Sequence, residues 1–199
     1  MTIRYKEEKI SDENLLRNYL KGDQEALISL VKRHQRAIYN LSFRFMGNSH
    51  DAWDSTQETF IRLINKAKSF KGISKFSTWI YRITCNVCKD ILKKRKKNIS
   101  QSFEEKKLEE QVIIKNRIYE VNDRILEAEE MDKVQNLLQK LPTKLRMVTV
   151  LNDIYDLKYK EISRILNIPL GTVKSRISRS REILRNILKE EREQKNNLL

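Results

Sequence analysis

The sequence predicts an all-α protein made of two small helical domains joined by a linker. Its 199 residues include only 4 Gly and 2 Pro, too few for the many tight turns of an all-β chain. Apolar residues recur at three- and four-residue steps over long segments, which is the spacing of amphipathic helices. The net charge of +14 divides into three blocks, +11 over residues 1–97, −4 over 98–130 and +7 over 131–199. We therefore expect a first domain at 1–97, an acidic flexible linker at 98–130 and a second domain at 131–199.

Helix signals and breakers divide the first domain into four expected helices. Ser11 or Asp12 can cap the first helix, and Gly22 interrupts the chain between the first helix and the second. Gly47 ends the second helix, and Ser49 can cap the third. The expected helices cover residues 11–20, 24–45, 51–68 and 78–97, with a loop at 70–77.

The second domain is expected to end in a helix-turn-helix unit over residues 159–188. Apolar periodicity returns at Met131, is interrupted by Pro142 and resumes before this unit. A short helix with inward Ile162, Ile165 and Leu166 precedes a turn containing Gly171. A longer basic helix follows, whose expected inner stripe is Val173, Ile177, Ser180, Leu184 and Ile187.

The outer face of that basic helix carries donors for base edges and phosphates. Lys174, Ser175, Ser178 and Arg179 lie away from the inner stripe. Any amphipathic hairpin shows buried Ile and Leu with a solvated charged face, which is the alternative interpretation. The short first helix, the glycine-containing turn and the alternation of Ser with Lys or Arg together favour a DNA-reading element.

The third expected helix presents a compact acidic and amide patch on an otherwise basic domain. Its members are Asp54, Gln57, Glu58 and Ile61. Such a patch repels DNA, so we expect it to meet a protein partner. A solvated first helical turn would account for Asp54 but not for the exposed isoleucine beside Gln57 and Glu58.

Residues 70–97 combine aromatic rings with cations, as unpaired bases require. Rings offer stacking surfaces and Lys or Arg side chains contact the phosphates. Some of these rings must instead belong to the core of so small a domain, and we expect about half of them to do so. The rings are Phe70, Phe76, Trp79 and Tyr81, and the cations include Lys71, Lys75, Arg82, Lys89, Lys93, Lys94 and Arg95.

Several functional classes are disfavoured by the composition. No apolar run approaches the roughly 20 residues needed to span a membrane, and the N-terminus has no hydrophobic signal core, so we expect a cytoplasmic protein. Cys85 and Cys88 have no matching further ligands, so small buried core residues are expected, with a redox pair as the alternative. We expect no metal, no cofactor and no catalytic residues.

The ordered motifs resemble those of bacterial RNA polymerase sigma factors. The segment DxxQETF (Asp54 to Phe60) comes first, then FKGISKFSTWIYRI, a basic helix, a linker and the C-terminal reader. The arrangement of two helical domains with only a linker between them resembles that of the extracytoplasmic-function group. The resemblance covers about residues 11–190. It implies a fold with a region 2 helical bundle and a region 4 helix-turn-helix, and a function in promoter recognition and DNA melting with core RNA polymerase.

The resemblance also implies a role for each surface. Asp54, Gln57, Glu58 and Ile61 match the segment that docks on the coiled coil of the β′ clamp. The residues that match −10 recognition are Lys71, Ile73, Ser74, Phe76, Trp79, Asn86, Lys89 and Lys93. Those that match −35 recognition are Thr172, Lys174, Ser175, Ser178 and Arg179. An anti-sigma partner is implied by the family alone, and no direct membrane insertion is expected.

Two other functions remain open from the residues themselves. A helix-turn-helix repressor or activator would use the C-terminal reader and treat residues 1–130 as a dimerisation or sensing domain. An enzyme acting on nucleic acid is the second alternative. The chain has no Gly-rich phosphate loop or HExxH pair, although Asp51 and Asp54 could hold a magnesium ion weakly.

Overall fold

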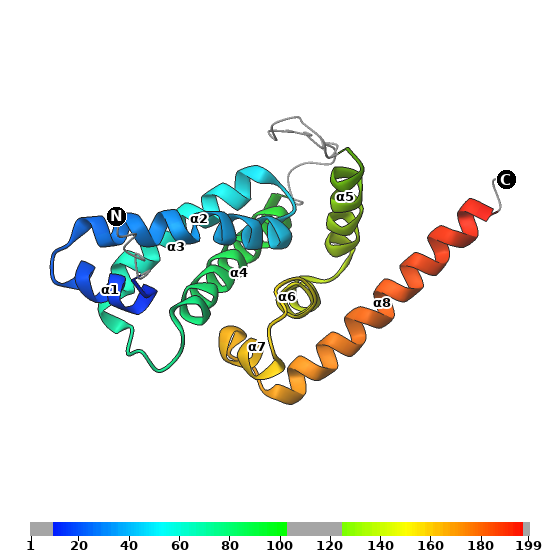
Figure 1. Ribbon diagram of the computed structural model, residues 1–199. Helices are drawn as coiled ribbons and strands as arrows, with labels where there is room; N and C mark the ends of the chain where they lie inside the picture. The colour runs from blue at the N-terminus through cyan, green and yellow to red at the C-terminus, as the bar shows by residue number, and fades with distance from the viewer. Residues whose placement is uncertain (1–9, 103–124, 197–199) are drawn as a thin grey trace, which may run out of the picture.

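The computed structural model describes residues 10–102 and 125–196, and these residues are helical with no β-strand (Figure 1). A short 3₁₀ turn, η1 (Ala67–Ser69), follows α3, and a π-helical turn, η2 (Val150–Ile154), follows α6. The predicted all-helical class is confirmed. The α-helices are α1 (Asp12–Leu20), α2 (Gln24–Met46), α3 (Ser49–Lys66), α4 (Phe76–Ser102), α5 (Ile125–Lys140), α6 (Thr143–Thr149), α7 (Tyr159–Leu166) and α8 (Leu170–Asn196).

Side-chain caps set the starts of the first helices. The Ser11 hydroxyl accepts from the backbone N–H of Asn14 at 3.3 Å, and the Asp23 carboxylate caps α2 in the same way. Gly47 ends α2 with a φ of +86°, a conformation that glycine adopts without strain. The cap of α3 is Asn48 and not the expected Ser49, because the Asn48 side chain accepts from the N–H of Asp51 at 2.9 Å. The helix therefore begins at Ser49, two residues before the expected start.

The four N-terminal helices enclose a core of their own. Helix α2 packs against α1, α3 and α4. Asp12 on α1 pairs with Arg33 and His34 on α2, and the Glu13 carboxylate accepts from the N–H of Phe76 at 2.9 Å. These contacts fix α1 across the start of α4. The buried residues of this core are Leu15, Leu16, Ala26, Leu30, Ile38, Leu63, Ala67, Phe76, Ile80, Ile83 and Val87.

The C-terminal helices pack around the helix-turn-helix unit. Helix α8 packs on α6 and α7, and Asn167 ends α7 with a φ of +53°. The predicted inner residues of both helices are buried as far as Ser180, but Leu184 and Ile187 are only half-buried. Helix α8 is long and continues to Asn196 (Figure 1), and its Glu191 pairs with Lys140 at the end of α5 at 2.7 Å.

A second core joins the N-terminal and C-terminal helices. Leu41 and Phe45 of α2 lie in it with Cys85 of α4, and Leu138 and Met147 enter from α5 and α6. The sequence pattern predicted a flexible tether between two separate bodies and gave no sign of this contact. Helices α4 and α5 extend into the expected linker at both ends, and its residues 103–124 lie outside the described part of the chain.

Candidate nucleic-acid and protein interfaces

The acidic patch lies on the outer side of α3. Gln57 is exposed, and Ile61 has 52% of its surface exposed. The Asp54 side chain is 57% exposed and that of Glu58 is 40% exposed. On the opposite side of the helix, Ala52, Thr56 and Leu63 are buried. The helix therefore presents carboxylates, an amide and an apolar side chain together on its outer side.

The two carboxylates of this patch differ in their availability. Glu58 is held by Arg62 at 2.7 Å, and Arg62 also pairs with Asp90 on α4 at 2.7 Å. The hydrogen bonds that Arg62 donates to the carboxylates of Asp90 and Glu58 raise the pKa of Arg62. Within the described part of the chain, Asp54 forms an ion pair only with the exposed His50, at 3.3 Å. Asp54 is thus the more accessible anion for a cationic partner.

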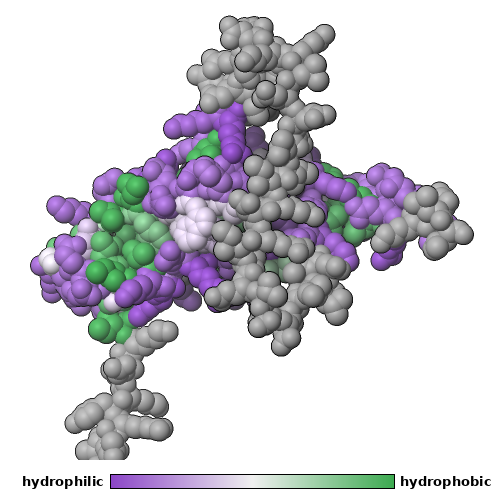
Figure 2. Space-filling model, turned by 90° about the horizontal axis from the view of Figure 1, so that it is seen from above, coloured by the Kyte–Doolittle hydropathy of each residue, from purple (hydrophilic) through white to green (hydrophobic). Residues whose placement is uncertain are grey.

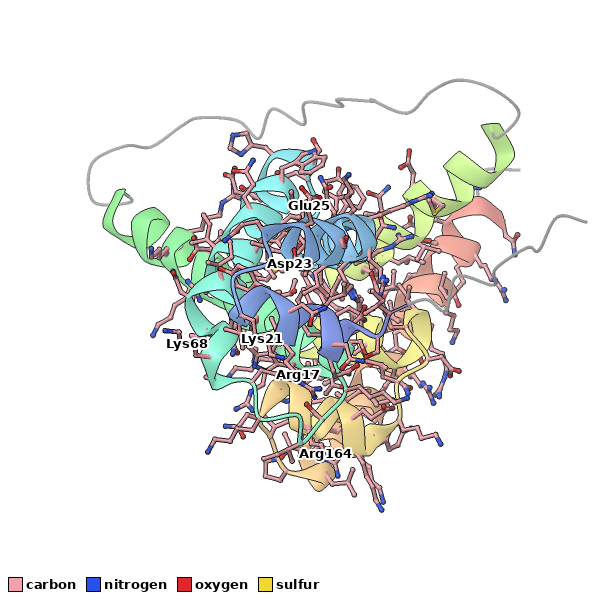
Figure 3. The ribbon with its side chains drawn as sticks, turned by 60° about the vertical axis from the view of Figure 1, so that its left-hand side comes forward. Arg17, Lys21, Asp23, Glu25, Lys68 and Arg164 are labelled. Atoms are coloured by element: carbon pink, nitrogen blue, oxygen red, sulfur yellow. The ribbon has the colours of Figure 1, made fainter. Side chains whose placement is uncertain are left out.

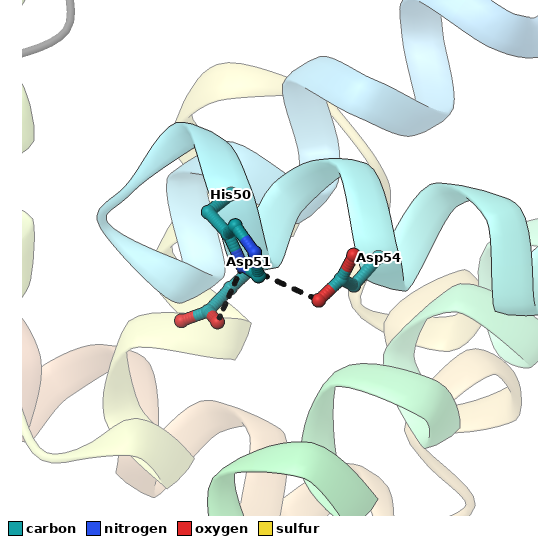
Figure 4. A group of neighbouring side chains, drawn as sticks. All are labelled: His50, Asp51 and Asp54. Atoms are coloured by element: carbon teal, nitrogen blue, oxygen red, sulfur yellow. Dashed lines mark ion pairs between the residues drawn. The ribbon is translucent and has the colours of Figure 1, made fainter.

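His50, Asp51 and Asp54 lie close together at the start of α3 (Figure 4). Their ligand atoms lie within 4.8 Å of one another, which is compatible with a metal ion. However, Arg95 pairs with the Asp51 carboxylate at 2.5 Å, and the Asn48 amide donates to it at 2.7 Å. The cluster is therefore better described as an ion-paired helix start that joins α3 to α4.

An aromatic and cationic groove lies beside the patch, between α2 and α3. Its volume is about 260 Å³, and its aromatic walls are Tyr39 and Trp53, with ring centroids 4.7 Å apart. Lys32, Gln35 and Arg36 complete the lining. Sequence reasoning did not identify this groove. The four-residue step from Lys32 to Arg36 is visible in the sequence and places both cations on one side of α2.

Exposed apolar side chains accompany the patch and the groove. Trp53 is 44% exposed, and Ile64 is 41% exposed, one helical turn beyond Ile61. Figure 2 shows hydrophobic surface exposed among hydrophilic residues over the N-terminal part of the molecule. Exposed apolar residues next to accessible charges are typical of a protein-binding face.

The loop between η1 and α4 divides its apolar residues between core and surface. Ile73 is 87% exposed at the loop tip, beside Gly72 with a φ of +68° and the exposed Lys71. Ser74 is half-buried. Phe76 is fully buried, and its ring packs 5.1 Å from the His34 ring and 6.1 Å from that of Phe70. The expectation that Phe76 contacts DNA is therefore corrected, because its ring is part of the core that supports the loop.

The candidate DNA-facing residues of α4 have unequal exposure. Trp79 is half-buried against Phe70, with ring centroids 5.1 Å apart, while Asn86 and Lys93 are exposed. Lys89 is half-buried, and its ammonium group lies 3.5 Å from the carbonyl oxygen of Leu166 at the end of α7. Arg95, expected in the same phosphate-binding track, is instead held by Asp51.

The reading face of α8 is open. Lys174, Ser175, Ser178 and Arg179 are exposed, and Thr172 is half-buried. The Ser175 hydroxyl donates to the carbonyl oxygen of Thr172 at 3.1 Å, which leaves its oxygen able to accept. The structure thus brings the expected donors together on one face of one helix, after a left-handed turn at Asn167.

Cations from α1 and α7 add to the basic surface. Figure 3 shows Arg17 of α1, Lys21 directly after that helix, Lys68 of η1 and Arg164 of α7 on the side that faces the viewer, below Asp23 and Glu25. All four cations are exposed. Sequence reasoning did not assign these four residues, because each is a single cation on a helix without a motif.

Cys85 and Cys88 are free and fully buried, which confirms them as core residues. Burial raises the pKa of the Cys85 thiol well above its usual range and that of Cys88 to about 11. Both thiols are therefore protonated at neutral pH and poorly reactive. No described helix is long and apolar enough to cross a membrane.

Comparisons with known proteins agree with the order of these surfaces along the chain. The sigma-70 region 2 family model matches residues 30–98, and the sigma-70 region 4 family model matches residues 131–184. The ECF RNA polymerase sigma factor SigW of Bacillus subtilis is 40% identical over 85% of this chain and 92% of its own. The ECF RNA polymerase sigma-E factor of Escherichia coli K12 is 35% identical over 90% of this chain and 95% of its own.

A solved structure has the same fold. The sigma factor RpoE of Bartonella quintana, in complex with the anti-sigma factor NepR, matches with a TM-score of 0.63. The match covers 80% of this chain and 94% of that chain at 23% identity.

Proposed function

The chain belongs to the extracytoplasmic-function group of bacterial RNA polymerase sigma factors, and from that premise we propose which of its surfaces perform each step of transcription initiation. A sigma factor binds core RNA polymerase and directs it to promoters, and this family function is that of the chain. The observation that carries the residue assignments is the presence of an acidic–apolar face on α3 and a Ser–Arg face on α8 of the same chain. A repressor or activator that acts without polymerase leaves the α3 face unexplained.

Residues 1–97 form the polymerase-binding and −10-binding domain. Asp54, Gln57, Glu58 and Ile61 dock on the β′ clamp, and a cationic partner surface complements the two carboxylates. Trp53 and Ile64 extend the apolar part of this contact because they are exposed on the same helix. Exposed aromatic and apolar side chains at the centre of an interface contribute most of its binding free energy.

The same domain captures the melted −10 element. The exposed Lys71 and Ile73, with Ser74, form a loop against which a flipped-out base can be held. Trp79, Asn86, Lys89 and Lys93 on α4 contact the adjacent bases and phosphates. The captured bases offset the few kcal/mol that unstacking costs, roughly as in other base-flipping proteins.

Residues 131–199 read the −35 element in the major groove. Lys174 and Arg179 donate to base edges or phosphates, and the small Ser175 and Ser178 let the helix approach closely. Thr172, at the start of α8, contacts the backbone. The linker at 98–130 joins the two domains, and α4 and α5 take up both of its ends, which leaves the 22 residues 103–124 between the helices. Those residues reach roughly 70 Å when extended. That is comparable to the roughly 70 Å of duplex, about 20 base pairs, between the two elements.

Regulation and location follow from the family premise. We propose a cytoplasmic protein whose polymerase-facing and DNA-facing surfaces are covered by an anti-sigma factor when transcription is not required. Sigma factors are not enzymes, and no covalent chemistry is proposed for this chain. It requires no cofactor or metal for these steps.

Charge reversal on α3 tests the docking assignment. Asp54→Lys places a cation where the polymerase should present one, so affinity for core polymerase should fall at least tenfold. Glu25→Lys is the matched control, since it makes the same charge change at an exposed site on α2. Fluorescence anisotropy of the labelled full-length chain, titrated with core polymerase, measures both affinities.

Equal affinities for the two charge-reversal variants would contradict the docking assignment. Binding of each variant to an upstream-element duplex should match that of the parent chain. That second measurement separates a docking defect from a general loss of folding.

A further inference from the structure

We propose that Glu13 is a positioning residue for the −10 loop, residues 71–75, and that its contact with α4 sets which base the loop selects. The inference rests on the proposed capture of a melted −10 base by this loop. It goes further because Glu13 lies on α1, 63 residues before its partner in α4, and touches no DNA in that proposal. Its basis is the way in which the start of α4 is capped.

The starts of the first three helices are capped by the residue directly before each helix. The first N–H groups of a helix have no partners within it and require acceptors from elsewhere. Ser11, Asp23 and Asn48 each precede the helix that they cap, and each side chain accepts from an N–H group of the first turn. These caps therefore tie each helix only to its own neighbouring residue.

The start of α4 is capped differently. Lys75 precedes this helix, and its ammonium group only donates hydrogen bonds, so it cannot serve as a cap. The N–H of Phe76, the first helical residue, donates instead to the Glu13 carboxylate at 2.9 Å. A carboxylate at this position is also favoured by the partial positive charge of the helix N-terminus. Helix α1 thus supplies the cap that Lys75 does not.

Helix α1 is itself held firmly against the first domain. Asp12, next to Glu13, pairs with Arg33 of α2 at 2.5 Å and with His34 at 2.8 Å. The His34 ring in turn packs on the buried ring of Phe76, with centroids 5.1 Å apart. The Glu13 carboxylate therefore extends from a fixed helix, and its bond to Phe76 fixes the start of α4 in turn.

The −10 loop has few conformations because both of its ends are held. At its start, the N–H of Phe70 donates to the carbonyl of Ala67 at 3.2 Å. At its end, Phe76 is buried and bonded to Glu13. Between these points the loop places Ile73 at its tip, with 87% of its surface exposed. A base is selected best by groups that are held in place before it arrives, so releasing one end of the loop should weaken selection.

Three substitutions separate positioning from stability. Glu13→Ala removes the cap of α4, whereas Glu13→Gln keeps an oxygen that accepts from the same N–H group. Asp23→Ala is the matched control, because it removes a carboxylate cap of α2 that accepts from the N–H of Glu25 at 3.0 Å. Loss of either cap should lower the stability of the chain to a similar extent, which urea unfolding measures. Only Glu13→Ala releases the loop.

The experiment measures base selection by core polymerase reconstituted with the full-length chain. Its template is a duplex library built on one promoter at which the parent chain starts RNA, with every position of the downstream element randomised. Open complexes that resist heparin are collected, and their DNA is sequenced. The enrichment of the best base over the worst base at each position gives the selectivity.

The expected result is a loss of selectivity at the captured base. Glu13→Ala should lower the enrichment at that position on the order of tenfold, while Glu13→Gln and Asp23→Ala should keep the enrichment of the parent chain. Unchanged enrichment in Glu13→Ala would overturn the inference. An equal loss in Asp23→Ala would show that stability decides selectivity, and an equal loss in Glu13→Gln would exclude the hydrogen bond as its cause; either result would also overturn the inference. A parent chain that enriches no base at any position would instead contradict the proposed function of the loop.

Discussion

At the residue scale, Arg179 and Lys174 are the side chains of α8 best suited to base recognition. Both are exposed on the outer face of the helix, while nearby Arg181 is held by Asp153 at 2.8 Å. A guanidinium can donate two parallel hydrogen bonds to a guanine edge, whereas an ammonium acts as a point charge. Arg179 is therefore expected to contribute sequence preference, and Lys174 to contribute affinity and register.

Truncation of Arg179 should weaken the upstream contact selectively. Arg179→Ala should cost roughly 1–3 kcal/mol on a duplex with the −35 element and much less on random DNA. Arg185→Ala, on an exposed position of the same helix beyond the reading face, is the control. Equal losses for Arg179→Ala on both duplexes, measured at one salt concentration, would reassign Arg179 to a phosphate contact.

Two neighbouring rings on α4 have different roles. Phe76 is fully buried, so Phe76→Ala should lower the free energy of unfolding by about 3–5 kcal/mol. Trp79 is half-buried, so Trp79→Ala should cost less stability and should reduce open-complex formation. Urea unfolding and permanganate reactivity of melted thymines measure the two effects. A larger stability loss for Trp79→Ala than for Phe76→Ala would contradict this division.

The helical residues were more predictable than those of the loop. The burial of Val173 and Ile177 and the exposure of Arg179 follow from their spacing along one regular helix. The sequence FKGISKFS has no such period, so nothing in it distinguishes the buried Phe76 from the exposed Ile73. Tertiary packing against His34 and Phe70 decides that difference.

At the element scale, the loop before α4 is held in place where it joins α4, and its tip is exposed. Glu13 of α1 accepts from the N–H of Phe76 at 2.9 Å, so the end of the loop is fixed by the first helix. Its tip carries the highly exposed Ile73 beside Gly72. A large apolar side chain held out in water contributes nothing to the core, which favours a role in contact with a ligand.

Removal of that side chain should affect DNA melting but not folding. Ile73→Ala should leave the free energy of unfolding unchanged and should lower the rate of open-complex formation several-fold, because the loop loses its contact with the captured base. Ile28→Ala, which shortens an exposed isoleucine on α2, is the control for both measurements. A drop in stability without a change in melting would contradict the loop assignment.

Contacts between elements were the least predictable part of the structure. The chemistry of Gln135, Gln139 and Arg146 is ordinary for exposed helical residues, and their partners are backbone carbonyls more than 90 residues away along the chain. A side chain that caps a distant helix leaves no local signature, unlike the capping of α1 by Ser11. The ends of helices could therefore be predicted only where the cap was adjacent in sequence.

At the scale of the whole molecule, the sequence has two basic blocks with an acidic segment between them. The excess of basic residues in each block favours approach to DNA, and the acidic face of α3 identifies where a protein partner is expected. Tethering two readers makes the second binding event intramolecular, so their specificities combine. In the free chain of Figure 1 the N-terminal and C-terminal helices share a buried core.

The most direct test of this account is the mapping of transcript 5′ ends after core polymerase transcribes genomic DNA with and without the full-length chain. We predict a new set of start sites that depends on the chain, each preceded by a shared downstream element and a shared upstream element at constant spacing. Arg179→Ala should deplete starts that depend on the upstream element. An identical set of start sites with and without the chain would contradict the account.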